Sequence, residues 1–250
     1  MSKPVIALQL YTVRDFTQED LKGTLTQLKD FGYNYVELAG MYNLPATEFK
    51  AMLDEIGLTA ISAHVPIQAF EQSVEGTVAD YKTVGCKFIG IPWLDKSQLP
   101  GGENWPKYKA LLQEAAAACK AAGITPMYHN HAHEFDTLPD GTYILDQFFN
   151  ELPEYETEID TGWVHAVDLC PAEYITKYSG RTPVVHLKDT HKIEKIDKPT
   201  GQGTQDMPGI TKAAVASGAQ VLVAELDAAV GLTSMEAAQQ SLAFLQGLGF

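Results

Sequence analysis

The sequence predicts an α/β fold in which a single domain, residues 1–250, forms a closed (β/α)8 barrel, also called a TIM barrel. Three observations predict it. Short runs rich in Val, Ile and Leu alternate with longer helical stretches, which is the pattern of stacked βαβ units around a parallel sheet. Eight such runs occur, and their last residues follow one another at intervals of 25 to 39 residues. The length of 250 residues is typical of this barrel.

The eight expected strands are short and mostly apolar, as strands that are buried on both faces of a parallel sheet should be. They lie at 5–10, 35–38, 59–63, 88–91, 125–128, 156–159, 184–187 and 221–226. No Ser/Gly linker or block of charge divides the chain, so we expect one domain.

The expected helices carry start and end signals. The first follows Thr17, has apolar residues at helical spacing and ends at Gly32. A long alanine-rich helix begins after Asn104 and ends at Gly123. The last helix begins at 233–236, which has the S/T-x-x-E pattern of a capping box.

Composition and charge exclude several classes of partner. The chain has 18 Lys and Arg against 32 Asp and Glu, a formal charge of −14, which repels nucleic acids and anionic lipid surfaces. No apolar run approaches the roughly 18 residues of a membrane helix. Lys3 leads directly into an apolar segment, so we expect no signal peptide. Cys86, Cys119 and Cys170 show no CxxC spacing, which favours a reducing cytoplasm. A homo-oligomer stays possible.

Polar residues of unusual type lie in the last part of the expected strands or directly after them. They are His64, the run HNHAHEF at 129–135, Asp160, His186, Lys188 and Glu225. Active sites of (β/α)8 barrels lie at this face, and an unpaired charge there costs several kcal/mol. One divalent cation would compensate them together. Carboxylate and imidazole ligands suit Mn²⁺ first, with Co²⁺, Mg²⁺, Fe²⁺ and Zn²⁺ as alternatives.

Each of these residues also has a structural interpretation by itself. Asp160 could cap the next turn, and His186 could donate a hydrogen bond to a backbone carbonyl. Lys188 could form an ion pair with Asp189 or with Glu225. Their coincidence at one face of the barrel favours the metal site.

Five motifs resemble those of the xylose-isomerase-like TIM barrels, the sugar phosphate isomerase/epimerase group. They are HNHAHEF (129–135), EID (158–160), VHLKD (185–189), GxGxxD (201–206) and AEL (224–226). The resemblance implies one divalent metal, with ligands Glu134, Asp160, His186 and Glu225. It also implies that His64, His131 and Lys188 line the substrate pocket.

The ligand from the fifth strand has two interpretations. In the ketose 3-epimerases of this group the first metal Glu lies inside that strand, where this chain has Tyr128 and His129. Glu134 could fold back to the metal. Alternatively, His129 takes that place, and Glu134 acts on the substrate.

A sugar isomerase or epimerase that acts through an enediolate is the expected function. The cation would be a Lewis acid, with Glu134, Glu225 or His131 as the base. Lys188 would neutralise the oxyanion or protonate a leaving group. His64 and His129 would bind the sugar. Trp93 and Trp163 would offer apolar faces to it or pack at the rim.

Three alternatives arise from the same residues. A dehydratase or lyase, of the inosose dehydratase or 3-keto-glycoside type, would lose a β-oxygen group from the same enediolate. A non-catalytic sugar-binding barrel needs no metal. The abasic-site endonucleases of this group are disfavoured, because the histidine after Asp160 comes five residues later and the chain is acidic.

We find no Lys/Arg cluster that would bind a phosphate group. The segment 201–206 is expected to be a lid loop that ends with Asp206 as a helix N-cap.

Overall fold

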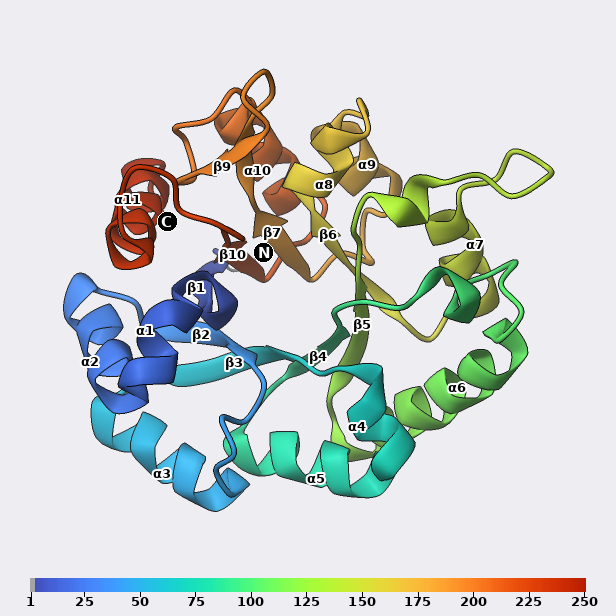
Figure 1. Ribbon diagram of the computed structural model, residues 1–250, viewed down its shortest axis with the longest axis horizontal. Coiled ribbons are helices and arrows are strands. Elements are labelled where there is room, and N and C mark those ends of the chain that lie inside the picture. Colours follow the sequence, from blue (N-terminus) through green and yellow to red (C-terminus); the bar gives the residue numbers. More distant parts are fainter. Residues whose placement is uncertain (1–2) are drawn as a thin grey trace.

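The computed structural model describes residues 3–250, and within them eight parallel strands form a closed barrel (Figure 1). The strands are β1 (Val5–Gln9), β2 (Tyr35–Ala39), β3 (Thr59–His64), β4 (Phe88–Ile91), β5 (Thr125–His129), β6 (Glu156–Asp160), β7 (Val184–Leu187) and β10 (Val221–Ala224). Their order around the barrel is β1-β10-β7-β6-β5-β4-β3-β2. The predicted (β/α)8 barrel is thus confirmed, and each predicted strand ends within two residues of the observed one.

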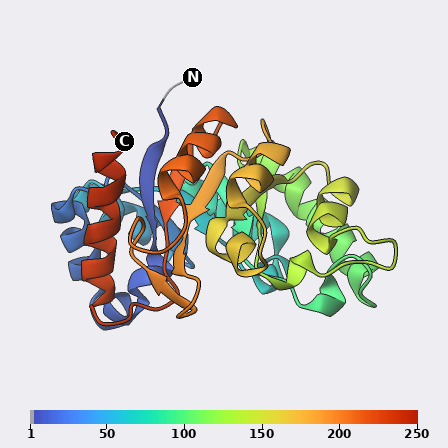
Figure 2. The same ribbon diagram turned by 90° about the horizontal axis from the view of Figure 1, so that it is seen from above.

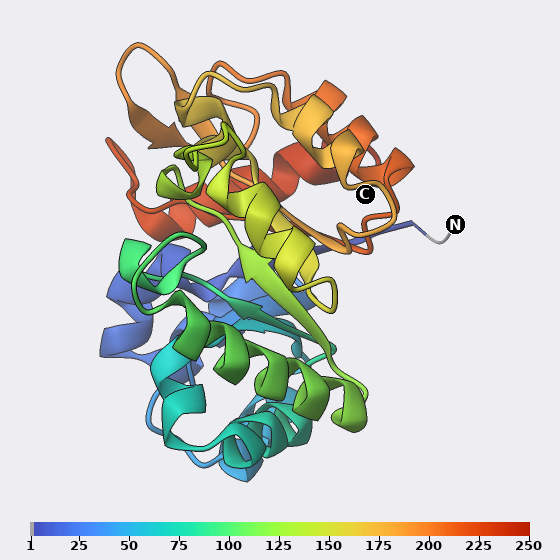
Figure 3. The same ribbon diagram turned by 90° about the vertical axis from the view of Figure 1, so that its right-hand side faces the viewer.

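Helices surround the barrel on all sides (Figure 1). They are α1 (Arg14–Glu19), α2 (Leu21–Phe31), α3 (Ala46–Ile56), α4 (Ile67–Gln72), α5 (Val74–Val84), α6 (Trp105–Ala122), α7 (Ile144–Glu151), α8 (Thr161–Ala166), α9 (Pro171–Lys177), α10 (Met207–Ala216) and α11 (Ser234–Gly247). Figure 2 shows the start of β1 and the end of α11 at the same end of the molecule, and Figure 3 shows α6 beside β5 on the outside of the barrel. No helix of residues 3–250 combines the length and the apolar character that crossing a membrane requires.

The helix signals are confirmed with one correction. Thr17 lies inside α1, and the chain is extended at Asp20, whose side chain accepts a hydrogen bond from the Gly23 amide and begins α2. The single helix expected after Thr17 is therefore two helices. The other signals hold, because α6 follows Asn104 and α11 begins with the complete capping box of Thr233 and Glu236.

The barrel interior is apolar in one half and polar in the other. A small cluster fills the half nearer the strand starts, and it consists of Ala7, Ile61, Phe88, Met127, Val184, Val221 and Val223. The larger core lies between the strands and the helices. Toward the strand ends the buried residues become polar and charged, among them Gln9, Glu37, Glu158, Asp160 and His186. The fold therefore concentrates buried charge at the face where (β/α)8 barrels have their active sites.

The loop predicted as a lid is fastened to Asp189, the first residue of a hairpin that the sequence did not predict, β8 (Asp189–His191) and β9 (Ile196–Lys198). Asp189 is fully buried, and its carboxylate accepts hydrogen bonds from the amides of Gly201, Gly203 and Gln205. A Cβ atom on Gly203 would lie 2.1 Å from Asp189 Oδ1. Glycine is therefore needed at this close approach.

The Asp189→Ala variant is expected to lose about 2–4 kcal/mol of unfolding free energy, because three amides lose a buried acceptor. Urea unfolding measures this. The matched control is Asp140→Ala, which removes an exposed carboxylate that accepts from the Thr142 amide. It should cost under about 1 kcal/mol. Equal losses in both variants would show that Asp189 does not hold the loop.

Candidate metal centre

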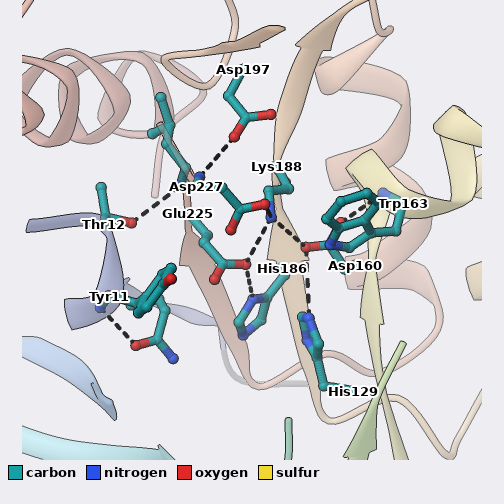
Figure 4. A network of polar contacts seen from close by, with 12 residues as sticks. Tyr11, Thr12, His129, Asp160, Trp163, His186, Lys188, Asp197, Glu225 and Asp227 are labelled. Carbon is teal, nitrogen blue, oxygen red and sulfur yellow. Dashed lines mark hydrogen bonds and ion pairs between the residues drawn. The ribbon is translucent and has the colours of Figure 1, made fainter. Parts of the chain in front are cut away.

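Four side chains from the ends of four adjacent strands converge at one face of the barrel. We call His129, Asp160, His186 and Glu225 the rim group. One ligand atom from each lies within 4.8 Å of the others, and all four residues are buried. His186 Nδ1 lies 2.8 Å from Glu225 Oε2, and His129 Nε2 lies 3.9 Å from Asp160 Oδ2. Figure 4 shows these side chains pointing toward one another.

The turn after β6 explains how Asp160 reaches this group. Its Oδ1 accepts a hydrogen bond from the Trp163 amide and so caps α8. Its Oδ2 is buried and finds no hydrogen-bond partner within residues 3–250. The cap and the ligand role, which the sequence left as alternatives, use different oxygens. Burial raises the pKa of Asp160 to about 8, although Lys188 lowers it. A nearby cation would remove this penalty on the charged form.

Neighbouring charges shift the pKa values of two other members of the rim group, Glu225 and His186, in opposite directions. Burial raises the pKa of Glu225, but the charges of Lys188 and His186 outweigh burial and hold this pKa well below its usual range. Burial lowers the pKa of His186, but the carboxylates of Glu37 and Glu225 outweigh it and raise this pKa well above its usual range. Glu225 therefore carries a negative charge that a cation at the rim group can neutralise.

Two further carboxylates lie deeper in the barrel, below the rim group. We call Glu37 on β2 and Glu158 on β6 the inner pair. Both are fully buried. Glu37 Oε1 lies 2.6 Å from His186 Nε2, and Glu158 Oε2 lies 2.9 Å from His64 Nε2. These two imidazole rings stack in parallel with their centroids 5.1 Å apart.

The structure does not bring Glu134 to the rim group, and this corrects the first of the two interpretations of the fifth-strand motif. The chain turns after β5 into a short 3-10 helix, His133–Phe135. There Glu134 Oε1 accepts from the Tyr128 hydroxyl at 2.8 Å, and Oε2 accepts from the His131 amide at 2.8 Å. His129 lies beside Asp160 instead, which is the place that the second interpretation gives it, and its role as a metal ligand stays a prediction. The path of the loop after β5, rather than the motif itself, determines whether Glu134 or His129 lies at the rim group.

Lys188 lies among the carboxylates at the same face. Its ammonium is 2.6 Å from Asp227 Oδ2, 3.7 Å from Asp160 Oδ2 and 3.8 Å from Glu225 Oε2. The ion pair with Asp189 that we considered is thus replaced by one with Asp227. A Cβ atom on Gly162 would lie 2.8 Å from Lys188 Cγ, so glycine leaves room for the lysine stem.

A cavity of about 510 Å³ opens above the rim group. Its polar lining includes five of the residues predicted for catalysis or substrate binding, namely His64, His129, His131, Lys188 and Glu225. Trp93 and Tyr11 also line it, and their side chains are 47% and 45% exposed. This volume is within the range of small-molecule sites.

Trp163 does not line this cavity. It lies 4.9 Å from the Lys188 ammonium, with its ring toward the cation, and lines a neighbouring cavity of about 390 Å³ with His165 and His191. The positions of the two cavities therefore do not support the predicted contact between Trp163 and the sugar. Its contact with Lys188 follows from the turn that begins α8.

Sequence reasoning gave no role to four buried polar residues or to Asp227. The four are the inner pair, Glu37 and Glu158, with Gln9 and Ser62. Gln9 and Ser62 hold Glu37, because Gln9 Nε2 donates to Glu37 Oε1 at 2.7 Å and the Ser62 hydroxyl donates to Glu37 Oε2. Glu37 lies inside an expected strand, and a charge in a strand buried on both faces is the signal that identified His186. The same criterion, applied to β2, would have identified Glu37.

Comparisons with known proteins agree on the fold. The family model for xylose isomerase-like TIM barrels matches residues 25–248. A search of curated proteins gave no match. A sugar phosphate isomerase/epimerase from Parabacteroides distasonis ATCC 8503 is similar in structure, with a TM-score of 0.82, 23% identity and coverage of 98% of this chain and 94% of that one.

Two other solved structures carry more specific descriptions. An L-ribulose 3-epimerase has a TM-score of 0.77 and 16% identity over 98% of this chain and 94% of its own. A 3-keto-D-glucoside 4-epimerase from E. coli has a TM-score of 0.74 and 18% identity over 98% of this chain and 100% of its own. At these identities the likeness establishes the shared fold.

Proposed function

Because the chain belongs to the xylose isomerase-like TIM barrel family, we propose that it is a divalent-metal-dependent isomerase or epimerase of a small hydroxy-carbonyl sugar. The observation that carries this proposal is the rim group, in which two carboxylates and two imidazoles from four strands meet below one cavity. Relatives described as epimerases of ketoses and of a keto-glucoside support the same class of reaction.

The residues of the rim group fit a divalent cation. His129, Asp160, His186 and Glu225 offer two nitrogen and two oxygen ligands, a mixed set that several divalent cations accept. We propose Mn²⁺, with Co²⁺, Mg²⁺, Fe²⁺ or Zn²⁺ as alternatives. The buried and unpartnered Asp160 Oδ2 supports this assignment, as far as residues 3–250 describe its surroundings. When bound, the cation supplies Lewis-acid polarisation of neighbouring hydroxyl and carbonyl oxygens of the sugar.

The protein's own groups then divide the work of proton transfer. Glu225 is the carboxylate of the rim group that lines the cavity, and we assign to it the acceptance of the proton from the carbon beside the carbonyl. Lys188 keeps its proton because burial, which lowers its pKa, is outweighed by the surrounding carboxylates. Lys188 lines the same cavity as Glu225, and we assign to its ammonium the stabilisation of the oxygen where negative charge develops. Burial lowers the pKa of His131 to about 3, so His131 is neutral and binds sugar hydroxyls.

A lyase is the second candidate, and the permanent ammonium of Lys188 beside Glu225 is the observation that favours it. A positioned ammonium can protonate an oxygen that leaves from the carbon next to the carbanion. Isomerase, epimerase and lyase thus share the first proton transfer and differ in the fate of the carbanion.

Removal of the metal tests the proposal. Chelator treatment is expected to abolish turnover, and Mn²⁺ or Co²⁺ is expected to restore it. The substrates to screen are ketoses, inososes and 3-keto-glycosides in D₂O, with product detection by mass spectrometry. An isomerase or epimerase gives a product of unchanged elemental composition, with deuterium at the reacting carbon. Release of water and an unsaturated product would establish the lyase. Tight binding of an unchanged sugar with every metal would establish a binding protein instead.

A further inference from the structure

The two imidazoles of the rim group each face two sets of carboxylates. His186 Nδ1 lies 2.8 Å from Glu225 Oε2, whereas its Nε2 lies 2.6 Å from Glu37 Oε1 and 3.4 Å from Glu158 Oε1. His129 Nε2 lies 3.9 Å from Asp160 Oδ2, whereas its Nδ1 lies 3.8 Å from Glu158 Oε2. Each ring therefore turns one nitrogen to the rim group and the other to the inner pair.

The inner pair is held in place from several strands. Glu37 accepts hydrogen bonds from Gln9 on β1 and Ser62 on β3. Glu158 Oε2 contacts His64 Nε2 at 2.9 Å, and a Cβ atom on Gly90 of β4 would lie 2.5 Å from this oxygen. The absence of a side chain at Gly90 thus leaves the space that the Glu158 carboxylate fills.

Three atoms between the rim group and the inner pair lack a hydrogen bond of good geometry among the described residues. They are His129 Nδ1, His186 Nε2 and Glu158 Oε1. Two are imidazole nitrogens and one is a carboxylate oxygen, so potential donors and an acceptor lie together. Glu37 Oε1 is close enough to His186 Nε2 for a hydrogen bond, but outside the linear arrangement that a strong one needs.

We infer that Glu37 and Glu158 are positioning residues for the metal centre, and this inference rests on the proposed function. A neutral imidazole binds a cation through the nitrogen that carries no hydrogen, and its other nitrogen then carries the hydrogen and needs an acceptor. Glu37 and Glu158 are the nearest carboxylates to His186 Nε2, and Glu158 is the nearest to His129 Nδ1. They select the tautomer in which Nδ1 of His186 and Nε2 of His129 are free to bind the cation.

A second cation among the same atoms is the competing explanation for this arrangement. His186 would then bind one cation through each ring nitrogen, which requires an imidazolate with no hydrogen on either. The possible ligands of the second cation are His64, His129, Glu158 and His186, and two of these, His129 and His186, already belong to the rim group. The positioning role is therefore the better supported, and cation stoichiometry separates the two.

Calorimetric titration of the metal-free protein with Mn²⁺ tests the inference. The wild type is expected to bind one ion, and Glu158→Gln and Glu37→Gln are expected to bind one ion about 10–100-fold more weakly. Glu158→Ala should bind more weakly than Glu158→Gln, because the amide oxygen of Gln still accepts a hydrogen bond. The matched control is Glu156→Gln on the same strand, which lies near the other end of the barrel with Thr125 and Thr182. Its affinity should stay within about twofold of the wild type.

Two further measurements separate positioning from folding. Melting temperatures of the metal-free proteins should show the variants folded, and the visible spectrum of bound Co²⁺ should change in Glu37→Gln and Glu158→Gln but not in Glu156→Gln. If either Gln variant fails to fold, Ser62→Ala removes only a donor to Glu37 and should weaken Mn²⁺ binding severalfold.

Three outcomes would overturn the inference. Unchanged Mn²⁺ affinity in Glu37→Gln and Glu158→Gln, with binding lost in Glu225→Gln, rejects the positioning role and leaves the proposed function intact. Two ions bound by the wild type and one by Glu158→Gln would establish an inner cation site instead. No ion bound by the wild type would reject both this inference and the proposed metal centre.

Discussion

Glu225→Gln is expected to lower proton exchange between substrate and solvent by about 10²-fold or more, the usual scale for a positioned general base. Glu225 is the carboxylate of the rim group that lines the cavity, and the nearby charges of Lys188 and His186 keep it ionised despite burial. Glutamine keeps the shape of the side chain but accepts no proton. Deuterium incorporation from D₂O at saturating Mn²⁺ measures the loss, and metal analysis of the same sample shows how much cation the variant retains.

Glu134→Gln is the informative comparison, because Glu134 was the second carboxylate among the three candidates for this role. Both of its oxygens accept hydrogen bonds away from the cavity, from the Tyr128 hydroxyl and the His131 amide. We expect a loss of less than about tenfold in exchange, through a looser turn after β5. The assignment would have to move to Glu134 if this variant lost about 10²-fold while Glu225→Gln kept full exchange.

Lys188→Met is expected to have opposite effects on turnover and on metal binding. Turnover should fall by about 10²–10³-fold, because a fixed positive group no longer faces the developing oxyanion. Mn²⁺ should bind about tenfold more tightly, because a unit charge 3.7 Å from Asp160 and 3.8 Å from Glu225 is removed. Asp227, which contacts the ammonium at 2.6 Å, offsets part of that charge and limits the gain.

Kinetics and Mn²⁺ titration of the same preparation measure both effects. Lys192→Met is the control, since Lys192 pairs with Asp168 at 2.6 Å in the neighbouring cavity and should change neither quantity. Weaker Mn²⁺ binding in Lys188→Met would mean that the lysine holds the rim group together rather than competing with the cation.

The structure brings together three of the four ligands that the sequence proposed, Asp160, His186 and Glu225. Their placement was predictable because each lies at or next to the end of a strand, and a closed parallel barrel gathers these ends at one face. Strand periodicity and spacing are local properties of the chain, so they could be recognised without knowing any long-range contact.

Glu134 and His129 show where such reasoning stops. Both belong to the motif after the fifth strand, and spacing alone allows either to reach the proposed metal centre. The choice depends on the turn that leads into the 3-10 helix and on the Tyr128 hydroxyl that receives Glu134. A loop conformation of this kind is set by contacts with the rest of the fold, which the motif does not contain.

The sequence by itself determined the barrel, the face where buried polar residues gather and the types of residue found there, because these depend on alternation, strand length and the low tolerance of buried strands for charge. Only the tertiary structure decided which side chains meet. It directs Glu134 away, places His129 beside Asp160, pairs Lys188 with Asp227 and sets Glu37 below His186. These pairings join residues from different strands and loops, and their energies depend on distances that exist only after the barrel has closed.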